Sequence, residues 1–312
     1  MPLRIEQLSK RYGNNWALRD IDLNAEDGRI FGIFGGTASG KSSLLRCIAG
    51  DEPINGGRIE TGGAAIHLAQ GKKDGGIASI FGKRTAGMSS GQARISEFER
   101  SLDNKAKVLL FDDPFAGIDE MVREKMFERL REAAADGKTV IFASSDFQQI
   151  AELCDRMVVL VDGYARQAGF PQEIYENPVS ADVAAIVGRN NLFAARRLTS
   201  TNAEMPEFFS IDGEHRLFAQ PTENHRIGAI NKNVTLAIRP EHISITFGAS
   251  FPEDNLLKAV VTGIRFFGET TLIDLDAGGL RLSARVFRVV GLNIGEECMI
   301  GMPPHRILVL KD

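Results

Sequence analysis

The hydrophobic and polar positions in the first half of the chain alternate between short apolar runs and stretches of helical periodicity. The helical spacing of apolar residues predicts helices over residues 41–49 and 121–135. The apolar runs predict strands over residues 3–8, 21–23, 29–34, 108–111 and 139–143. Strands that alternate with helices in this way are typical of an α/β fold with a largely parallel sheet.

After about residue 190 the pattern changes to strands with alternating apolar and polar positions, which predicts an all-β barrel or sandwich. The predicted strands are 235–246, 256–265, 271–275, 280–286 and 307–310. The sequence Asp276-Ala277-Gly278-Gly279 predicts a tight hairpin turn between two of them. A short helix at 181–187 precedes this half, so we expect one domain at 1–188 and a second at 189–312.

Composition and charge narrow the classes of protein that fit. The 312 residues are 43% hydrophobic and 25% charged, a balance that excludes a largely disordered chain. The net charge of −4 excludes a protein whose main task is to cover nucleic-acid phosphates, so no nucleic-acid partner is expected. Three widely spaced cysteines fit a reducing compartment. The apolar runs are too short to cross ~30 Å of hydrocarbon, so a membrane role requires a partner.

Residues 35–42 match the phosphate-binding pattern G-x-x-x-x-G-K-[ST], between an apolar strand and a helix as the motif requires. Glycines let successive backbone N–H groups face one anion, and the helix start adds its positive dipole end. Lys41 would meet the β- and γ-phosphates, and the Ser42 hydroxyl would ligate Mg²⁺. A glycine-rich turn that matches by chance is the alternative, and the correct flanking elements disfavour it. The predicted contacts are Gly35, Gly36, Thr37, Ala38, Ser39, Gly40, Lys41, Ser42 and Ser43.

A pair of acids follows the apolar strand at residues 108–111. Asp112 is placed at the carboxyl end of that strand, where a P-loop protein holds its magnesium shell. Asp113 comes next and could polarise an attacking water, which makes it a candidate catalytic residue. The alternative is an acidic turn after a core strand, and the phosphate loop makes the metal-holding role the better interpretation.

Together these features resemble the ATP-binding subunits of ABC transporters, an α/β P-loop NTPase fold. Residues 88–92, Met-Ser-Ser-Gly-Gln, resemble the family's LSGGQ signature, and residues 114–119 resemble the segment that leads into its D-loop. The resemblance implies two ATPase subunits that face each other head to tail. It also implies contact with the partner subunit's ATP by Ser89, Ser90, Gly91, Gln92 and Asp119.

The same resemblance assigns three further positions. Tyr12 stands where the family's aromatic residue stacks on adenine, and Gln70 where its glutamine reaches the metal and senses the membrane partner. Ser145 aligns with the switch segment that contacts the γ-phosphate. Each residue taken alone could be an ordinary surface residue, and their shared order along the chain favours the functional interpretation.

The second half is similar to the TOBE domain, an OB-like β domain that follows the ATPase in importers of sugars, glycerol phosphates, polyamines, ferric iron or oxyanions. Residues 237–242, Ala-Ile-Arg-Pro-Glu-His, carry this resemblance. It implies ATP and Mg²⁺ as cofactors and a peripheral position on the cytoplasmic face of the membrane. The implied partners are permease subunits, a solute-binding protein, and a second ABC ATPase subunit in a homodimer or heterodimer.

The chain departs from the family pattern at four places. Asp113 replaces a glutamate, Ser145 replaces a histidine, and Ser90 replaces a glycine. Residues 71–87 are too few for the helical subdomain against which a permease helix docks. We therefore expect a chain that binds Mg-ATP, hydrolyses it slowly alone, and works best beside a fully equipped ATPase subunit. The alternatives are a non-transport ATP-binding regulator and a small-molecule P-loop kinase; the kinase leaves the signature-like segment unexplained.

Overall fold

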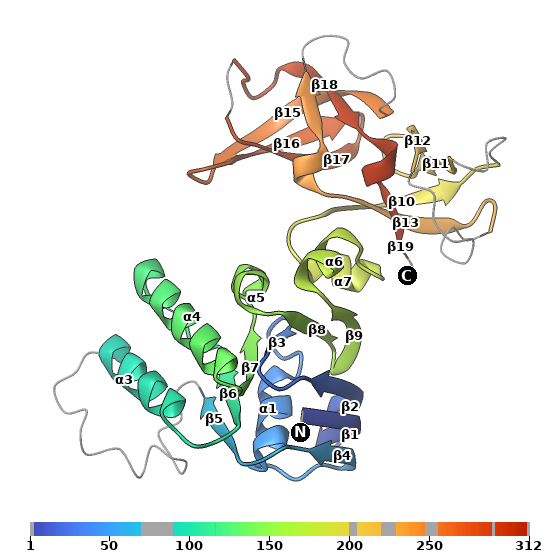
Figure 1. Cartoon of the computed structure of the whole chain (residues 1–312). Coiled ribbons are helices and arrows are strands. Elements are labelled where there is room, and N and C mark those ends of the chain that lie inside the picture. Colours follow the sequence, from blue (N-terminus) through green and yellow to red (C-terminus); the bar gives the residue numbers. More distant parts are fainter. Residues whose placement is uncertain are drawn as a thin grey trace. The chain divides into compact units, whose positions relative to one another are not determined.

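The computed structural model describes residues 3–69, 90–115, 117–199, 205–219, 229–246, 255–288 and 291–310. The chain divides into two compact units, Met1–Glu176 and Asn177–Asp312 (Figure 1). The sequence pattern predicted the domain boundary after residue 188, on the C-terminal side of the predicted short helix. In the structure this helix, α7 (Ala181–Ile186), lies in the second unit, where Ala184 is buried with Ala237 and Leu310.

The first unit is built on a six-stranded sheet whose strands are parallel except for the last. In spatial order the strands are β5 (Ala65–Ala69), β6 (Val108–Asp112), β7 (Thr139–Ser144), β3 (Ile30–Phe34), β8 (Arg156–Val161) and β9 (Tyr164–Gly169). The predicted α/β architecture is confirmed. Because the carboxyl ends of parallel strands share one edge, the segments that follow β3, β6 and β7 meet there.

Among the described residues of the first unit, four helices lie between strands of this sheet and a fifth follows β9. They are α1 (Lys41–Ala49), α3 (Ser90–Leu102), α4 (Glu120–Ala135), α5 (Phe147–Leu153) and α6 (Pro171–Glu176). The predicted bounds of α1 are confirmed, since Gly40 and Gly50 flank it with φ of 106° and 77°, values that suit glycine. Among the described residues, no helix combines the length and the apolar character that a membrane span requires.

A three-stranded antiparallel sheet completes the first unit, in the order β2 (Asn15–Ala25), β1 (Leu3–Tyr12) and β4 (Gly56–Glu60). Leu8 and Leu18 of this sheet lie in one buried cluster with Leu44 of α1 and Leu110 of β6. The small sheet therefore packs over α1 and the main sheet, and Tyr12 ends a strand held against the helix that follows the phosphate loop.

In the second unit, the regular elements among the described residues are strands apart from α7 and short 3₁₀ turns, as predicted. One sheet contains β12 (Arg216–Phe218), β11 (Glu207–Ser210), β10 (Asn191–Arg197), β13 (Asn233–Ile238) and β19 (Leu308–Leu310) in spatial order. The other contains β14 (Ser244–Thr246), β18 (Glu297–Met302), β15 (Asn255–Phe266), β16 (Thr271–Ala277) and β17 (Leu280–Val286). The two sheets share one buried core. Gly278 and Gly279 both have positive φ, which confirms the predicted hairpin turn.

The single strand predicted over residues 235–246 is wrong. A 3₁₀ turn at Pro240–His242 separates β13 from β14, and the two strands belong to different sheets. Proline has no N–H to donate to a ladder and is confined to edges, bulges and breaks in strands. Pro240 therefore ends β13 and lets the chain cross from one sheet to the other.

Two buried asparagines, one in each sheet, form hydrogen bonds with the backbone of an edge strand of the opposite sheet. The Asn191 amide of β10 donates to Ser283 O of β17 at 2.9 Å, and Ser283 N donates to Asn191 Oδ1 at 2.7 Å. In the reverse direction, the Asn255 amide of β15 donates to Phe218 O of β12 at 2.9 Å, and Phe218 N donates to Asn255 Oδ1 at 2.7 Å. These side chains imitate strand pairing between the sheets.

Candidate functional site

The phosphate loop connects β3 to α1, and two of its glycines are required by sterics. A Cβ at Gly35 would lie 2.5 Å from Leu160 O, and a Cβ at Gly40 would lie 2.6 Å from Ala17 O. Gly40 also has a φ of 106°, a conformation that other residues rarely adopt. The loop is therefore pressed against neighbouring backbone, and a bulkier residue at either position would change its course.

Lys41 lies folded inside this loop. Its Nζ donates to Gly35 O at 2.6 Å, to Gly36 O at 2.8 Å and to Ser39 Oγ at 3.5 Å. Burial lowers the pKa of Lys41, and the nearby carboxylates of Asp112 and Asp113 oppose that shift. The loop thus holds one buried amine near two acids, the set of charges that a magnesium-bound triphosphate would bridge.

The start of α1 offers further donors. Gly40 caps the helix with no side-chain hydrogen bond, and the first helical bond runs from Leu44 N to Gly40 O. The amides of Lys41, Ser42 and Ser43 precede that bond, at the positive end of the helix dipole. The residues present therefore fit a phosphate group, with the Ser42 hydroxyl half-buried at the same turn.

Asp112 and Asp113 lie where the sequence predicted them, at the carboxyl end of β6. Asp112 is level with Ala143 of β7, and Asp113 N donates to Ala143 O at 2.8 Å. Asp113 has a φ of 47°, a left-handed conformation that aspartate tolerates better than most residues. Burial raises the pKa of Asp113; Lys41 opposes this shift and Asp112 adds to it.

Two serines at the end of β7 contact Asp113. Ser145 Oγ donates to Asp113 Oδ2 at 3.4 Å, and Ser144 Oγ donates to Asp113 Oδ1 at 3.5 Å. Ser145 was a predicted site residue, whereas Ser144 was not. The sequence gives one indication of Ser144: it stands next to Ser145, at the end of a predicted strand. The structure thus brings Lys41, Asp112, Asp113 and Ser145 to one edge of the sheet.

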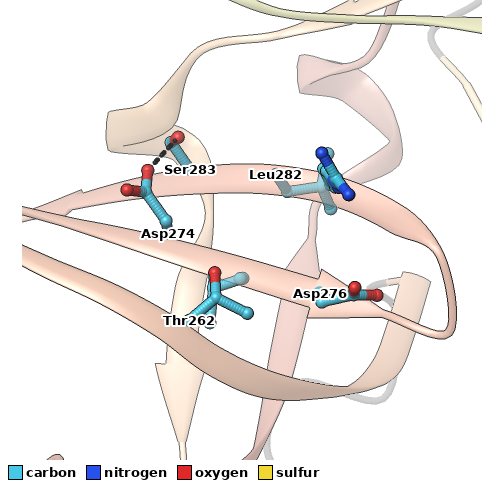
Figure 2. Close-up of a pocket in the computed structure, with 7 residues that line it drawn as sticks. Thr262, Asp274, Asp276, Leu282 and Ser283 are labelled. Carbon is cyan, nitrogen blue, oxygen red and sulfur yellow. Dashed lines mark hydrogen bonds between the residues drawn. The ribbon is translucent and has the colours of Figure 1, made fainter. Parts of the chain in front are cut away.

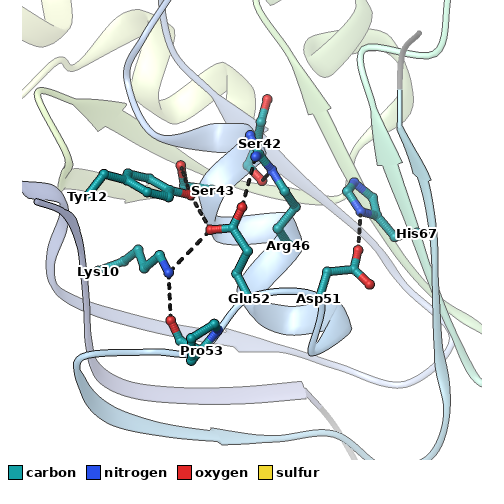
Figure 3. A network of polar contacts seen from close by, with 9 residues as sticks. All are labelled: Lys10, Tyr12, Ser42, Ser43, Arg46, Asp51, Glu52, Pro53 and His67. Atoms are coloured by element: carbon teal, nitrogen blue, oxygen red, sulfur yellow. Dashed lines mark hydrogen bonds and ion pairs between the residues drawn. The ribbon is translucent and has the colours of Figure 1, made fainter. Parts of the chain in front are cut away.

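Tyr12 contacts α1, the helix that begins at Lys41 (Figure 3). Its hydroxyl hydrogen-bonds to Glu52 and lies 3.3 Å from Ser43 Oγ, while the residue stays 43% exposed. Burial and the Glu52 contact raise the pKa of Tyr12. Glu52 was missed by sequence reasoning because it belongs to no recognised motif, and only folding brings it to Tyr12.

The remaining predicted residues are placed less completely. Gln70 and Ser89 lie outside the described residues. Ser90, Gly91 and Gln92 form the first turn of α3, so the signature-like segment opens a helix. Asp119 directly precedes α4 and is exposed.

The second unit has a separate hollow of about 410 Å³ on the face formed by β15, β16 and β17. Asp274 and Asp276 line it, with Thr262 and Ser283 (Figure 2). Ser283 Oγ donates to Asp274 Oδ1 at 2.8 Å, and Arg265 pairs with the same carboxylate. None of the residues that line this hollow was predicted from the sequence to belong to a functional site.

Comparison with known families gives two matches. Residues 18–81 match the ABC transporter family, and residues 236–310 match the TOBE domain family. The first range contains the phosphate loop and α1, and the second runs from the end of β13 to β19. Each match falls in the unit where the sequence pattern suggested it.

Relatives align along nearly the whole chain at low identity. The sulfoquinovosyl glycerol transport ATP-binding protein SmoE of Agrobacterium fabrum is 25% identical, over 97% of this chain and 95% of that protein. The maltose/maltodextrin import ATP-binding protein MalK of Mannheimia succiniciproducens is 24% identical, over 99% and 95%. The alignment with SmoE spans 349 positions, and 97% of 312 residues fills only about 303 of them. SmoE therefore has residues that this chain lacks.

Solved structures agree on the fold. A nucleotide-free ATP-binding cassette from an ABC transporter superposes with a TM-score of 0.52 at 18% identity, over 59% of this chain and 99% of that one. The ADP-bound conformation of the cassette MJ1267 gives the same TM-score and coverage. At this identity the likeness concerns the fold alone, and it assigns the cassette architecture to part of the chain.

Proposed function

The chain belongs to the ABC family of transporter ATPases and carries a TOBE domain, and from this premise we propose that it powers a solute importer by binding Mg-ATP. In this proposal the triphosphate lies along residues 35–43 and the adenine stacks on Tyr12. Ser42, Asp112 and Gln70 would hold Mg²⁺, which supplies charge neutralisation at the phosphates. Asp113 would orient the attacking water, and Ser145 would contact Asp113 beside the γ-phosphate.

One observation carries the proposal. The Lys41 amine is buried in a loop that supplies two carbonyl acceptors, and the negative charges of Asp112 and Asp113 both stabilise its protonated form. A triphosphate with its magnesium would replace the loop carbonyls at the amine and occupy the space toward the acids. A surface salt bridge would leave the charged end of the lysine in water, whereas Lys41 is 9% exposed.

The proposal includes a partner ATPase subunit. Ser89, Ser90, Gly91, Gln92 and Asp119 would face the partner's ATP, and the start of α3 at Ser90 supports this because a helix N-terminus attracts phosphate. Asp113 and Ser145 are shorter than the glutamate and histidine that they replace, so we propose slow hydrolysis at this chain's own site. A heterodimer with a fully equipped subunit would compensate for that weakness.

The remaining partners in this proposal are permease subunits and a solute-binding protein, and the chain itself would lie at the cytoplasmic face of the membrane. SmoE and MalK carry names for sugar-type solutes, and the aligned CysA of Bacillus cereus, 25% identical over 100% of this chain and 99% of that protein, is named for sulfate/thiosulfate import. The solute class therefore differs among relatives of equal similarity. We assign none to this chain.

The test combines calorimetry with capture from membranes. Wild-type chain should bind ATP with Mg²⁺ at micromolar to millimolar concentration, Lys41→Ala should abolish binding, and Lys125→Ala, a change at an exposed residue of α4, should leave it intact. The tagged chain should also retain integral membrane subunits from a detergent extract of its source. Absence of nucleotide binding at millimolar ATP would refute the ATPase role. Binding without any captured membrane subunit would favour the non-transport regulator.

A further inference from the structure

Glu52 lies at the centre of a polar network that joins β1 to α1 (Figure 3). Its carboxylate accepts a hydrogen bond from Tyr12 and one from Arg46 Nη1 at 2.9 Å, and it pairs with Lys10 Nζ at 3.3 Å. Lys10 and Tyr12 belong to the strand that ends in the exposed aromatic ring, and Arg46 belongs to the helix that starts at the phosphate loop. One side chain therefore connects the two ends of the proposed nucleotide site.

The network fixes the Tyr12 ring at its tip while leaving ring surface open. The hydroxyl is held between Glu52 and Ser43, and Lys10 Nζ lies 4.9 Å from the ring centroid, over one face. Tyr12 is nevertheless 43% exposed. A ring that is anchored at its hydroxyl and covered on one face by a cation presents its other face in a fixed orientation, as a stacking platform requires.

The charges of the network depend on Glu52. The Lys10 side chain is 7% exposed and that of Glu52 19%, so both charges are largely removed from water. Burial opposes ionisation of Glu52, but the contacts with Tyr12, Lys10 and Arg46 outweigh it and lower the pKa of the carboxyl. Without Glu52, Lys10 and Arg46 would be two cations with no carboxylate between them, and the Tyr12 hydroxyl would lose its charged acceptor.

We propose that Glu52 is a positioning residue for the nucleobase: it holds the Tyr12 ring in the orientation that stacks on the base and ties that ring to α1. The inference rests on the proposed function, since Tyr12 must meet the base of bound ATP. The two roles can be tested separately, because the phosphate loop would contact the triphosphate whereas Glu52 would act only on the base.

The test compares ATP with inorganic tripolyphosphate, which has the phosphates and no base, by calorimetry with Mg²⁺. Glu52→Ala should weaken ATP binding about 5- to 10-fold, a part of what base–aromatic stacking contributes, and leave tripolyphosphate binding within about 2-fold. Glu52→Gln should restore most of the ATP affinity, because its amide oxygen still accepts from Tyr12. Asp51→Ala removes the neighbouring carboxylate, which contacts His67 Nδ1 at 3.2 Å, and should change neither affinity.

Tyr12→Phe gives an independent check that keeps the ring and removes the hydroxyl. It should lower ATP affinity as much as Glu52→Ala does, and the double variant should lose no more than either single one. Equal weakening of ATP and tripolyphosphate by Glu52→Ala, or a Tyr12→Phe variant with unchanged ATP affinity, would overturn the inference and leave the phosphate site standing. A wild-type chain that binds neither ligand would overturn the proposed function and this inference together.

Discussion

Ser145 Oγ donates a hydrogen bond to Asp113 Oδ2 over 3.4 Å, at the end of β7 and β6 respectively. In the resemblance to ABC ATPases, these two residues stand where a glutamate and a histidine are expected. The two departures therefore concern residues in direct contact. Under the proposed function, a short acid and a short hydroxyl therefore contact each other beside the γ-phosphate.

The pH dependence of ATP hydrolysis should report this contact. Burial raises the pKa of Asp113 and the Ser145 hydroxyl opposes that rise, so a base role for Asp113 predicts activity that increases with pH through a raised pKa. Ser145→Ala should move this acid limb to higher pH, because the ionised carboxylate loses a donor. Phosphate release measured across pH checks the shift. An acid limb that stays in place or moves to lower pH contradicts the role.

Lengthening the acid should raise turnover at some cost in stability. Asp113→Glu adds one methylene of reach toward the attacking water, whereas Asp113→Asn removes the base and should lower the steady-state rate about 10-fold or more. Residue 113 has a φ of 47°, which suits aspartate better than glutamate, so Asp113→Glu should lose ~0.5–1 kcal/mol of unfolding free energy. Equal rates of ATP hydrolysis for the wild type and the two variants would show that Asp113 takes no part in the reaction.

Gly40 and Gly36 offer a matched pair for the steric argument. Gly40→Ala places a Cβ 2.6 Å from Ala17 O at a φ of 106°, and should lower the free energy of unfolding by ~2–4 kcal/mol. Gly36→Ala meets nothing within 4 Å and should change it by less than ~1 kcal/mol. Urea unfolding of both variants gives the comparison. Equal stability of the two variants would contradict the steric assignment.

The asparagine contacts between the two sheets should dominate polar stabilisation in the second unit. Asn191→Ala and Asn255→Ala each leave part-buried backbone groups of an edge strand without their side-chain partner, so each should cost ~2–4 kcal/mol of unfolding free energy. The double variant should lose close to the sum, since the two clusters share no partner. Thermal unfolding followed by circular dichroism measures this. A loss below ~1 kcal/mol for either variant would contradict the assignment.

The three cysteines should resist modification in the folded chain. Cys47, Cys154 and Cys298 are free and buried, and burial raises the pKa of each thiol, most strongly for Cys154. Because the thiolate is the reactive form, a disulfide reagent should label them slowly under native conditions and all of them in denaturant. Rapid native labelling would show that a cysteine lies in a segment that opens easily.

Elements with strong local signals were predicted well. Helix α1 is bracketed by two glycines, and β17 follows a Gly-Gly turn, so their bounds match the sequence prediction. Strands β10, β11 and β12 were not predicted, because short strands owe their position to pairing across the sheet rather than to local preference. Pro240 does indicate a break between β13 and β14, because proline interrupts strands. The alternating apolar and polar residues on both sides of it nevertheless favoured one continuous strand.

For the candidate site, too, residues in local motifs could be predicted from the sequence, and residues that act through long-range contacts could not. The phosphate loop, Asp112 and Asp113 are contiguous motifs, and they could be placed from spacing and flanking strands. Glu52 and Ser144 act through contacts that only the packing of α1, β1 and β7 creates. Sequence spacing cannot reveal a carboxylate that meets an aromatic hydroxyl forty positions away.

The reciprocal asparagine contacts also bear on how the second unit behaves among copies of itself. A peripheral strand with free amides and carbonyls is a template on which another chain can grow a ladder. On β12 and β17 some of those groups are already occupied from within the molecule. Loss of either asparagine would therefore leave edge-strand N–H and C=O groups unpaired as well as weaken the fold. We expect such a variant to aggregate on storage.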